Sequence, residues 1–201
     1  MKKILPLFSY AFHPVFIPLM GSSLYLYIYR SFFEINEIQI TLVRIGILTL
    51  FIPLVFLYFL KVIGKIDSMM IQKAEQRKMP LGFQVMLMSL LLMSVELYQS
   101  MPGLYVFFLG GMTATLLALS FLFMQKKISL HMIGISALTA FAMGISLETG
   151  ENMSSLIALL FIACGAVASS RLSMKAHNYS ELTLGFISGL LPQILLWRLW
   201  L

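Results

Sequence analysis

The chain has 201 residues, of which 60% are hydrophobic and only 11% are charged, and its mean hydropathy is +0.93. Soluble domains carry about 25% charged residues, so this composition excludes an ordinary soluble protein and predicts an integral membrane protein. The net charge of +6 suits anionic headgroups or an anionic substrate. We therefore expect membrane lipids, and no nucleic acid, as partners.

A membrane-spanning helix needs about 20 mainly apolar residues. Seven stretches approach this length, at residues 9–29, 38–63, 81–98, 103–124, 128–147, 153–170 and 182–200. Pro14 and Pro18 interrupt the first stretch, so a surface or re-entrant segment is an alternative to a span there. We predict an all-α, polytopic transmembrane helical bundle of six to seven spans.

No segment between these stretches is long enough to fold alone. Residues 1–201 are therefore expected to form a single integral membrane domain, multi-pass, in a bacterial inner membrane. The sequence does not indicate an oligomeric state. Small residues at Gly185 and Gly189, and from Ala163 to Ser170, predict close packing between the last two spans.

Polar residues concentrate in three short clusters, at residues 73–80, 127–131 and 169–181. Two predicted spans separate each cluster from the next, and two crossings return a chain to the same face of the membrane. All three clusters are therefore expected to meet at one face. This expectation does not depend on whether the first stretch spans the membrane.

The third cluster holds His177 and Glu181, which are four residues apart and would share one face of a helix. The carboxylate would fix the tautomer of the imidazole. His131 comes from the second cluster. These groups predict a phosphoryl-transfer site in which His177 attacks phosphorus to form a phosphohistidine and His131 protonates the departing alkoxide, before water releases phosphate.

Each cluster also supplies a cation, namely Arg77, Lys127 and Arg171. Three cations around one phosphoryl group would balance its negative charge and stabilise the charge that develops during transfer. We expect this chemistry to need neither a metal nor another cofactor.

The third cluster resembles the third motif of the type 2 phosphatidic acid phosphatase superfamily of membrane lipid phosphatases. That motif is Ser-Arg, five residues, His, three residues and an acid, usually Asp. Here Ser170 and Arg171 are followed at the same spacing by His177 and by Glu181 in place of the aspartate.

The other two motifs of the family are kept less completely. The middle motif, Pro-Ser-Gly-His, corresponds to Ser129 and His131, with Ile128 and Leu130 in place of the proline and glycine. The first motif is Lys, six residues, Arg-Pro. Its counterpart is a looser grouping across the first cluster, formed by Lys73, Arg77 and Pro80 at a different spacing.

The resemblance implies a lipid-phosphatase-like core at residues 61–200 and a substrate that is a lipid phosphate or diphosphate. Catalytic roles fall to His177, His131 and Glu181. Phosphate-binding roles fall to Arg171, Arg77, Lys127, Ser129 and Lys73.

Three alternatives remain beside the phosphatase. The same pocket would suit a catalytically inactive protein that binds or transports a lipid phosphate. A zinc site could be built from His131, His177 and Glu181. Another membrane enzyme, such as a prenyltransferase, would need an acid-rich magnesium site, and the chain has a single aspartate, Asp67.

Other polar residues have structural interpretations. His13 is expected to take an interfacial or packing role. Arg44 and Glu96 lie within predicted spans and are expected to pair, with Glu148 as a possible third member, because unpaired ions are costly in hydrocarbon.

Two considerations disagree about which face of the membrane holds the three clusters. Lys and Arg are far more frequent on the cluster side than on the other side, so the positive-inside rule favours the cytoplasm. Bacterial relatives of the resembled family often act on the outer face.

Overall fold

The computed structural model describes residues 5–69, 71 and 73–201, and all regular secondary structure in this part is helical. The α-helices are α1 (Leu5–Ala11), α2 (Ile17–Ile28), α3 (Ile35–Gly46), α4 (Ile52–Val62), α5 (Ala74–Leu92), α6 (Val95–Ser100), α7 (Pro102–Phe123), α8 (Leu130–Thr149), α9 (Ser154–Ser173) and α10 (Tyr179–Leu196). Short 3₁₀ turns lie at Arg30–Phe32 and Trp197–Leu199. The predicted all-α helical bundle is confirmed.

In the described part of the chain, five helical segments are long and apolar enough to cross a membrane. They are Ile35–Val62, Pro102–Phe123, Leu130–Thr149, Ser154–Ser173 and Tyr179–Leu199. The chain is therefore an integral, multi-pass membrane protein. Five of the seven predicted stretches correspond closely to these segments.

The other two predicted stretches differ from the helices that form. The first is broken after Ala11, so only the twelve residues of α2 continue as an apolar helix. Pro14 lies in the break and has no N–H to continue the hydrogen-bond ladder, whereas Pro18 lies in the first turn of α2, where no such N–H is needed. The third begins earlier than predicted, since α5 starts at Ala74 and takes in much of the first polar cluster. It also ends earlier, and residues up to Ser100 form the separate helix α6.

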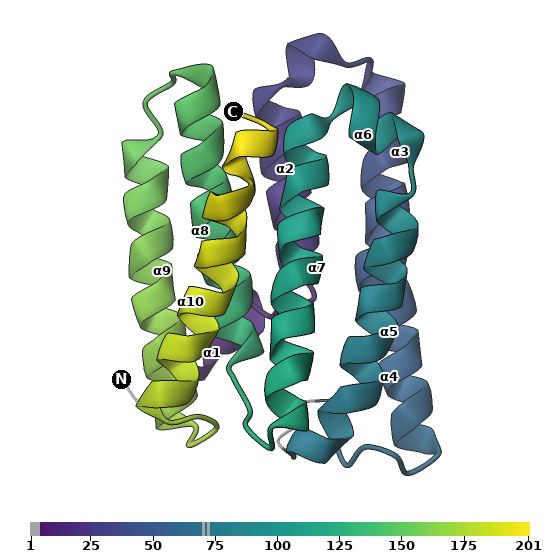
Figure 1. Cartoon of the computed structure of the whole chain (residues 1–201), viewed down its shortest axis with the longest axis vertical. Coiled ribbons are helices and arrows are strands. Elements are labelled where there is room, and N and C mark those ends of the chain that lie inside the picture. Colours follow the sequence, from purple (N-terminus) through teal and green to yellow (C-terminus); the bar gives the residue numbers. More distant parts are fainter. Residues whose placement is uncertain (1–4, 70, 72) are drawn as a thin grey trace.

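A π-helical turn, Ile47–Phe51, joins α3 to α4 within one long helix. Pro53 lies two residues after this turn and cannot donate to the carbonyl four residues before it, which favours a locally widened turn. The N–H of Ile52 accordingly donates to the carbonyl of Ile47, five residues back. The long helix therefore passes the proline without a break in its direction (Figure 1).

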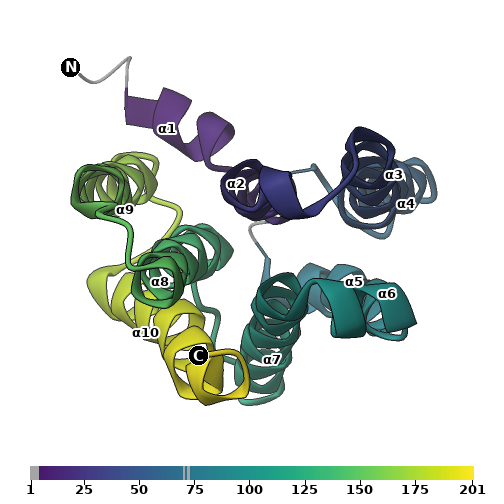
Figure 2. The same cartoon turned by 90° about the horizontal axis from the view of Figure 1, so that it is seen from above.

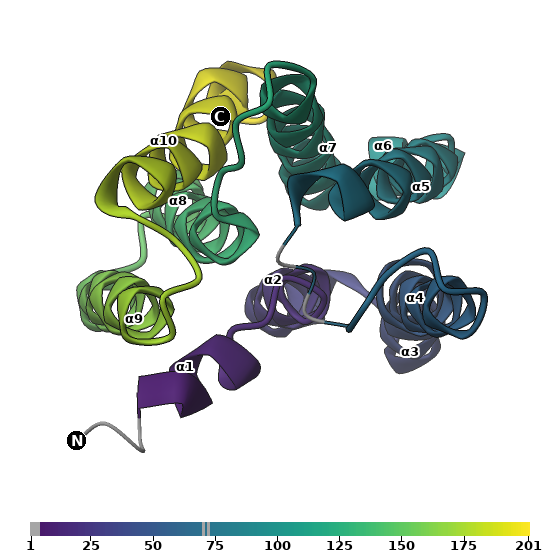
Figure 3. The ribbon, with the colours of Figure 1, turned by 90° about the horizontal axis from the view of Figure 1, so that it is seen from below.

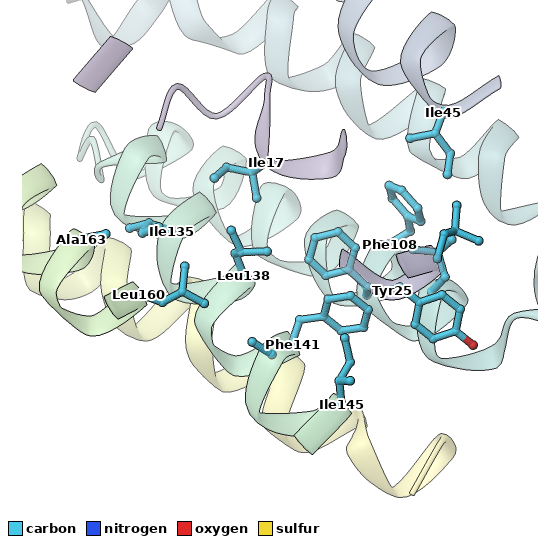
Figure 4. Close-up of a cluster of buried hydrophobic side chains, with 14 of the residues drawn as sticks. Ile17, Tyr25, Ile45, Phe108, Ile135, Leu138, Phe141, Ile145, Leu160 and Ala163 are labelled. Atoms are coloured by element: carbon cyan, nitrogen blue, oxygen red, sulfur yellow. The ribbon is translucent and has the colours of Figure 1, made fainter. Parts of the chain in front are cut away.

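The long helices form two groups with α2 and α7 between them, as the end-on views show (Figures 2 and 3). Helices α8, α9 and α10 make one group, and α3, α4 and α5 make the other. Helix α1 lies across the axes of the long helices, beside α9 (Figure 3). The aromatic side chains of Tyr25, Phe108 and Phe141 from α2, α7 and α8 help to fill the buried core (Figure 4).

The closest helix contact joins α10 to α8, two spans apart in sequence. A Cβ atom added at Gly185 would lie 2.6 Å from the carbonyl oxygen of Ser129, and one at Gly189 would collide with the carbonyl of Ile133. The prediction that these glycines pack the last two spans together is therefore wrong. They let the backbone of α10 approach α8, because glycine alone leaves room for a neighbouring main chain.

The connections α4–α5, α7–α8 and α9–α10 all lie at one end of the bundle, which we call the site end (Figure 1). Two residues after the end of each preceding helix the backbone takes a positive φ, at Gly64 (71°), Gln125 (58°) and Lys175 (51°). After each of the three helices, the N–H groups of this residue and of the next one bond back to the last turn in the Schellman pattern. All three helices therefore end in a sharp turn at the site end, where the three predicted polar clusters also lie.

Candidate active site

A tight turn after α9 connects Arg171 to His177. The N–H of Lys175 donates to the carbonyl of Leu172 at 2.9 Å, and the N–H of Ala176 donates to that of Arg171 at 3.1 Å. This closed turn needs a left-handed residue, and Lys175 takes that role in place of the more usual glycine. Both Arg171 and His177 are buried.

Glu181 orients the ring of His177 and also helps to cap the N-terminus of α10. Its carboxylate accepts from Nδ1 of His177 at 2.6 Å and from the N–H of Asn178 at 3.4 Å. The side chain of Asn178 in turn accepts from the N–H of Glu181, which completes a capping box. With its proton held on Nδ1, the ring presents the lone pair of Nε2 as a nucleophile.

Burial lowers the pKa of His177, and the cations Arg77 and Arg171 lower it further, while the hydrogen bond to Glu181 acts in the opposite direction. The side chain of His177 is only 1% exposed. A lowered pKa keeps the ring neutral at neutral pH, which is the form that can attack an electrophile.

The second cluster packs against the first turn of α10. The N–H of Ser129 donates to the carbonyl of Glu181 at 3.1 Å, and Nζ of Lys127 lies 3.9 Å from the carboxylate of Glu181. The hydroxyl of Ser129 caps α8 by accepting from the N–H of Met132. Lys127 and Ser129 therefore support the turn around His177.

The first cluster contributes one buried cation. Arg77 donates through Nε and Nη2 to the carbonyl of Ile71, at 3.0 and 2.8 Å, and through Nη1 to that of Ile128 at 3.3 Å. Lys73 lies outside this arrangement, because its exposed ammonium pairs with Asp67 at 2.8 Å.

His131 is held by Ser9 of α1. Helix α1 lies outside the core that the family resemblance implies, residues 61–200. Nε2 of His131 lies 3.1 Å from the carbonyl oxygen of Ser9, and a carbonyl can only accept, so the proton of the neutral ring is on Nε2. The hydroxyl of Ser9 lies 2.6 Å from that of Ser170. Helix α1 is therefore fixed beside Arg171 and sets the orientation of His131.

His13 is a site residue that the sequence interpretation missed. Its ring lies edge-on to that of His131, with centroids 5.2 Å apart. Burial and the nearby Arg171 lower the pKa of His13. The available signal was a histidine beside a proline at the membrane end where the polar clusters were expected.

A single cavity of about 220 Å³ unites the groups from these segments. Its polar lining at the site end comprises His13, Arg77, His131, Arg171 and His177. The other proposed residues, Glu181, Lys127, Ser129 and Lys73, do not line it among the residues that the structure describes. The three clusters thus converge on the cavity: the first contributes Arg77, the second His131, and the third Arg171 and His177.

Arg171 is the least satisfied group in this cavity. The residue is 5% exposed, and within the described part of the chain Nε has no hydrogen-bond partner. Nη1 reaches only the sulfur of Met174, at 3.8 Å. A buried cation without an acidic partner is strongly destabilising unless an anion neutralises it.

The predicted pair of Arg44 and Glu96 forms, at 2.8 Å, with Ser94 as a third member in place of Glu148.

Across residues 5–69, 71 and 73–201, no group of three His, Cys, Asp or Glu side chains is arranged to hold a metal ion. In comparisons with protein-family models, curated proteins and solved structures, nothing matches this chain.

Proposed function

We propose that this chain is a membrane-embedded phosphatase that removes phosphate from a lipid phosphate or diphosphate through a phosphohistidine intermediate. The observation that carries the proposal is the buried guanidinium of Arg171, which lacks an acidic partner in the described structure and shares a cavity with a Glu181-oriented His177. An anionic phosphoryl group is the ligand that this combination of cation and nucleophile suits.

In the proposed reaction, Nε2 of His177 attacks phosphorus and the bond from phosphorus to the alkoxide oxygen breaks. His131 acts in its imidazolium form in this step: Nε2–H stays on the carbonyl of Ser9, and the second proton, on Nδ1, goes to the alkoxide. His131 then takes a proton from water, which attacks the phosphohistidine and releases inorganic phosphate. Arg171 and Arg77 stabilise the charge on the transferred group.

The proposal includes six or seven spans in a bacterial inner membrane. Helix α5 packs along α7 and would be the sixth span, although its first turns are polar. Helix α2, with twelve residues, would be part of a seventh. Membership in the type 2 phosphatidic acid phosphatase superfamily is part of the same proposal and is supported by the spacing of Ser170, Arg171 and His177.

A specific observation favours a second candidate, a catalytically inactive protein that binds or transports a lipid phosphate. The guanidinium of Arg77 already donates to two backbone carbonyls. Leu130, which replaces the glycine of the family's middle motif, lines the cavity. Both features reduce the number of groups that are free to stabilise a transition state.

A phosphate-release screen over lipid phosphates and diphosphates, run with purified protein, separates the two candidates. The phosphatase releases phosphate from at least one lipid, and His177→Ala lowers the rate by about 10³-fold or more. Lys175→Asn is the matched control, because this exposed residue lies in the same turn and asparagine tolerates a positive φ. Binding without release in the wild type would favour the second candidate.

A further inference from the structure

His13 lies in the turn between α1 and α2, and the proposed reaction leaves this residue without a role. The turn is closed by a hydrogen bond of 2.9 Å from the N–H of Phe16 to the carbonyl of His13. It is held on both sides, because the carbonyl of Ser9 on α1 is hydrogen-bonded to α8. On the other side, Ile17 of α2 packs so closely on α8 that a Cβ at Gly134 would lie 2.8 Å from it. The fold therefore fixes the position of His13 at the cavity.

The local hydrogen bonds of His13 determine which ring nitrogen carries its proton. The N–H of Val15 donates to Nδ1 of His13 at 3.4 Å, so the proton of the neutral ring is on Nε2. Burial and the nearby Arg171 lower the pKa of His13, which keeps the ring neutral at pH 7. Within the described part of the chain, Nε2 makes no hydrogen bond. His13 therefore offers a neutral N–H donor to a ligand in the cavity that it lines.

The ring of His13 lies beside the general acid of the proposed reaction. Its centroid is 5.2 Å from that of His131, and the two rings are edge-on at 87°. Among the described residues its ring contacts are with His131 and Phe16, and none is with His177. In phosphoryl transfer the nucleophile and the leaving group lie roughly in line, on opposite sides of phosphorus. A donor next to the acid therefore faces the leaving group.

The two substrate classes of the proposed function differ in what they offer to a donor at this position. The leaving group of a monophosphate is an alkoxide, whose oxygen takes the proton from His131 and is followed directly by hydrocarbon. The leaving group of a diphosphate is a second phosphoryl group, which has further anionic oxygens to accept an N–H donor. The position of His13 therefore favours a diphosphate.

The charge of the cavity favours the same substrate. Arg77, Arg171 and the imidazolium form of His131 make three positive charges, and the lining that the structure describes contains no aspartate or glutamate. A monophosphate ester carries about −1.5 to −2 charges at pH 7, and a second phosphoryl group adds roughly one more. A diphosphate therefore comes closer to neutralising these buried cations.

We propose that His13 determines specificity, with its Nε2–H binding the leaving phosphoryl group of a lipid diphosphate. The inference rests on the proposed function for the roles of His177 and His131, and it deepens that function by assigning the substrate class. Nε2 of His177 attacks the terminal phosphorus, and the bond from that phosphorus to the bridging oxygen breaks. The bridging oxygen takes the proton from His131 and leaves as part of a lipid monophosphate. Water then gives a proton to His131 and releases inorganic phosphate from His177.

The test compares phosphate release from tetradecyl diphosphate and from tetradecyl monophosphate by the purified full chain. The wild type should favour the diphosphate in kcat/KM by about tenfold or more. His13→Asn keeps an acceptor for the N–H of Val15 but has no donor at the position of Nε2. It should lower kcat/KM for the diphosphate about 10- to 100-fold, as expected for a lost hydrogen bond to a charged group. The loss with the monophosphate should stay below about threefold.

Two further variants sharpen the comparison. His13→Gln places an amide N–H near the position of Nε2 and should recover most of the diphosphate activity. Leu7→Ala is the matched control on α1, because Leu7 is exposed, and it should change neither rate. Equal losses with both substrates in His13→Asn would overturn the inference, since His13 would then only position His131. Equal rates of the wild type with the two substrates would overturn it as well.

Binding of analogues that cannot be hydrolysed separates failure of this inference from failure of the proposed function. The probes are tetradecyl methylenediphosphonate and tetradecyl phosphonate, titrated by calorimetry into the protein in lipid nanodiscs. Tighter binding of the diphosphonate that is lost in His13→Asn, without hydrolysis of any lipid phosphate, would support the diphosphate-binding role of His13 and remove the phosphatase. Hydrolysis by a wild type that binds both analogues equally would keep the phosphatase and remove the role of His13.

Discussion

Two arginines lie within apolar helices that are long enough to span the membrane, and their surroundings are opposite. Arg44 on α3 is 40% exposed by its side chain and pairs with Glu96 at 2.8 Å. Arg171 on α9 is 5% exposed, and its Nε has no partner in the described structure. The first cation is neutralised within the protein, whereas the second faces a cavity and is ready for an anion from outside.

The helices around these arginines differ in the same way. In the most apolar 18-residue stretch of α8, 72% is buried inside the protein, whereas the same share in the long helix Ile35–Val62 is 22%. Helix α8 is surrounded by α10, α9, α7 and α2 and carries His131. We infer that the α8–α10 region fixes the chemistry of the site, while the α3–α4 helix encloses the cavity and faces lipid.

The largest expected effect comes from removing the buried cation, Arg171. Arg171→Ala should lower kcat/KM for phosphate release by about 10³-fold, because a fixed donor to the developing charge is lost. Arg171→Lys should recover part of this loss, since it restores the charge without the planar pair of donors. Steady-state phosphate release measures both, and an Arg171→Ala variant within tenfold of wild type would contradict the assignment.

A smaller loss is expected when the partner of His177 is changed. Glu181→Gln should lower kcat about 10²-fold, because an amide does not hold the proton on Nδ1 as firmly. The hydrogen bond to Glu181 raises the pKa of His177, so its removal should also move the acid limb of the pH profile to lower pH.

The wild-type pH profile follows from the direction of the same shift. The pKa of His177 in the folded protein lies below the ordinary value of about 6.5, so the neutral nucleophile persists as the pH falls through 6.5. The stability that this neutral ring contributes is complete above pH 6.5 and is lost as the pH falls below it. A rate that already declines between pH 8 and pH 7 on the acid side would contradict a neutral His177.

Packing differences between the two regions should appear in stability rather than in rate. Gly189→Leu forces a side chain against the backbone of α8 and should destabilise the protein by about 1–3 kcal/mol or more. Gly165→Leu on the open side of α9 should leave the unfolding temperature nearly unchanged. Thermal unfolding in detergent measures the contrast, and equal melting temperatures would show that α10 does not depend on this approach.

The smallest expected effect on activity is that of the paired arginine. Arg44→Ala should change phosphate release by less than about threefold, because neither Arg44 nor Glu96 lines the cavity and the pair makes its contacts between α3 and the start of α6. A loss comparable to that of Arg171→Ala would remove the distinction between the two environments.

The C-terminal part of the fold could be predicted closely from the sequence, because long apolar runs and capping residues there agree. Helix α10 begins at Asn178 and Glu181, which form a capping box, and α8 begins at the cap Ser129. The N-terminal part was less predictable. Pro14 and Pro18 divide the first stretch, and the polar start of α5 is helical because Arg77 turns inward to backbone carbonyls.

The site was predictable where residues are close in sequence and less so where they are distant. The spacing of His177 and Glu181 by one helical turn predicts their hydrogen bond, which forms at 2.6 Å. The contact of Ser9 with His131 and the approach of His13 cannot be predicted this way. They depend on how α1 lies across the bundle, and no local pattern specifies that orientation.

The most direct measurement is the search for a covalent phosphoryl group on His177 after rapid mixing with a labelled lipid phosphate and quenching at alkaline pH. We expect a label that is stable to base, labile to acid, located on His177, and absent from His177→Ala. Phosphate release at the wild-type rate by His177→Ala, or turnover with no label at His177, would contradict the proposal that this cavity transfers a phosphoryl group to that histidine.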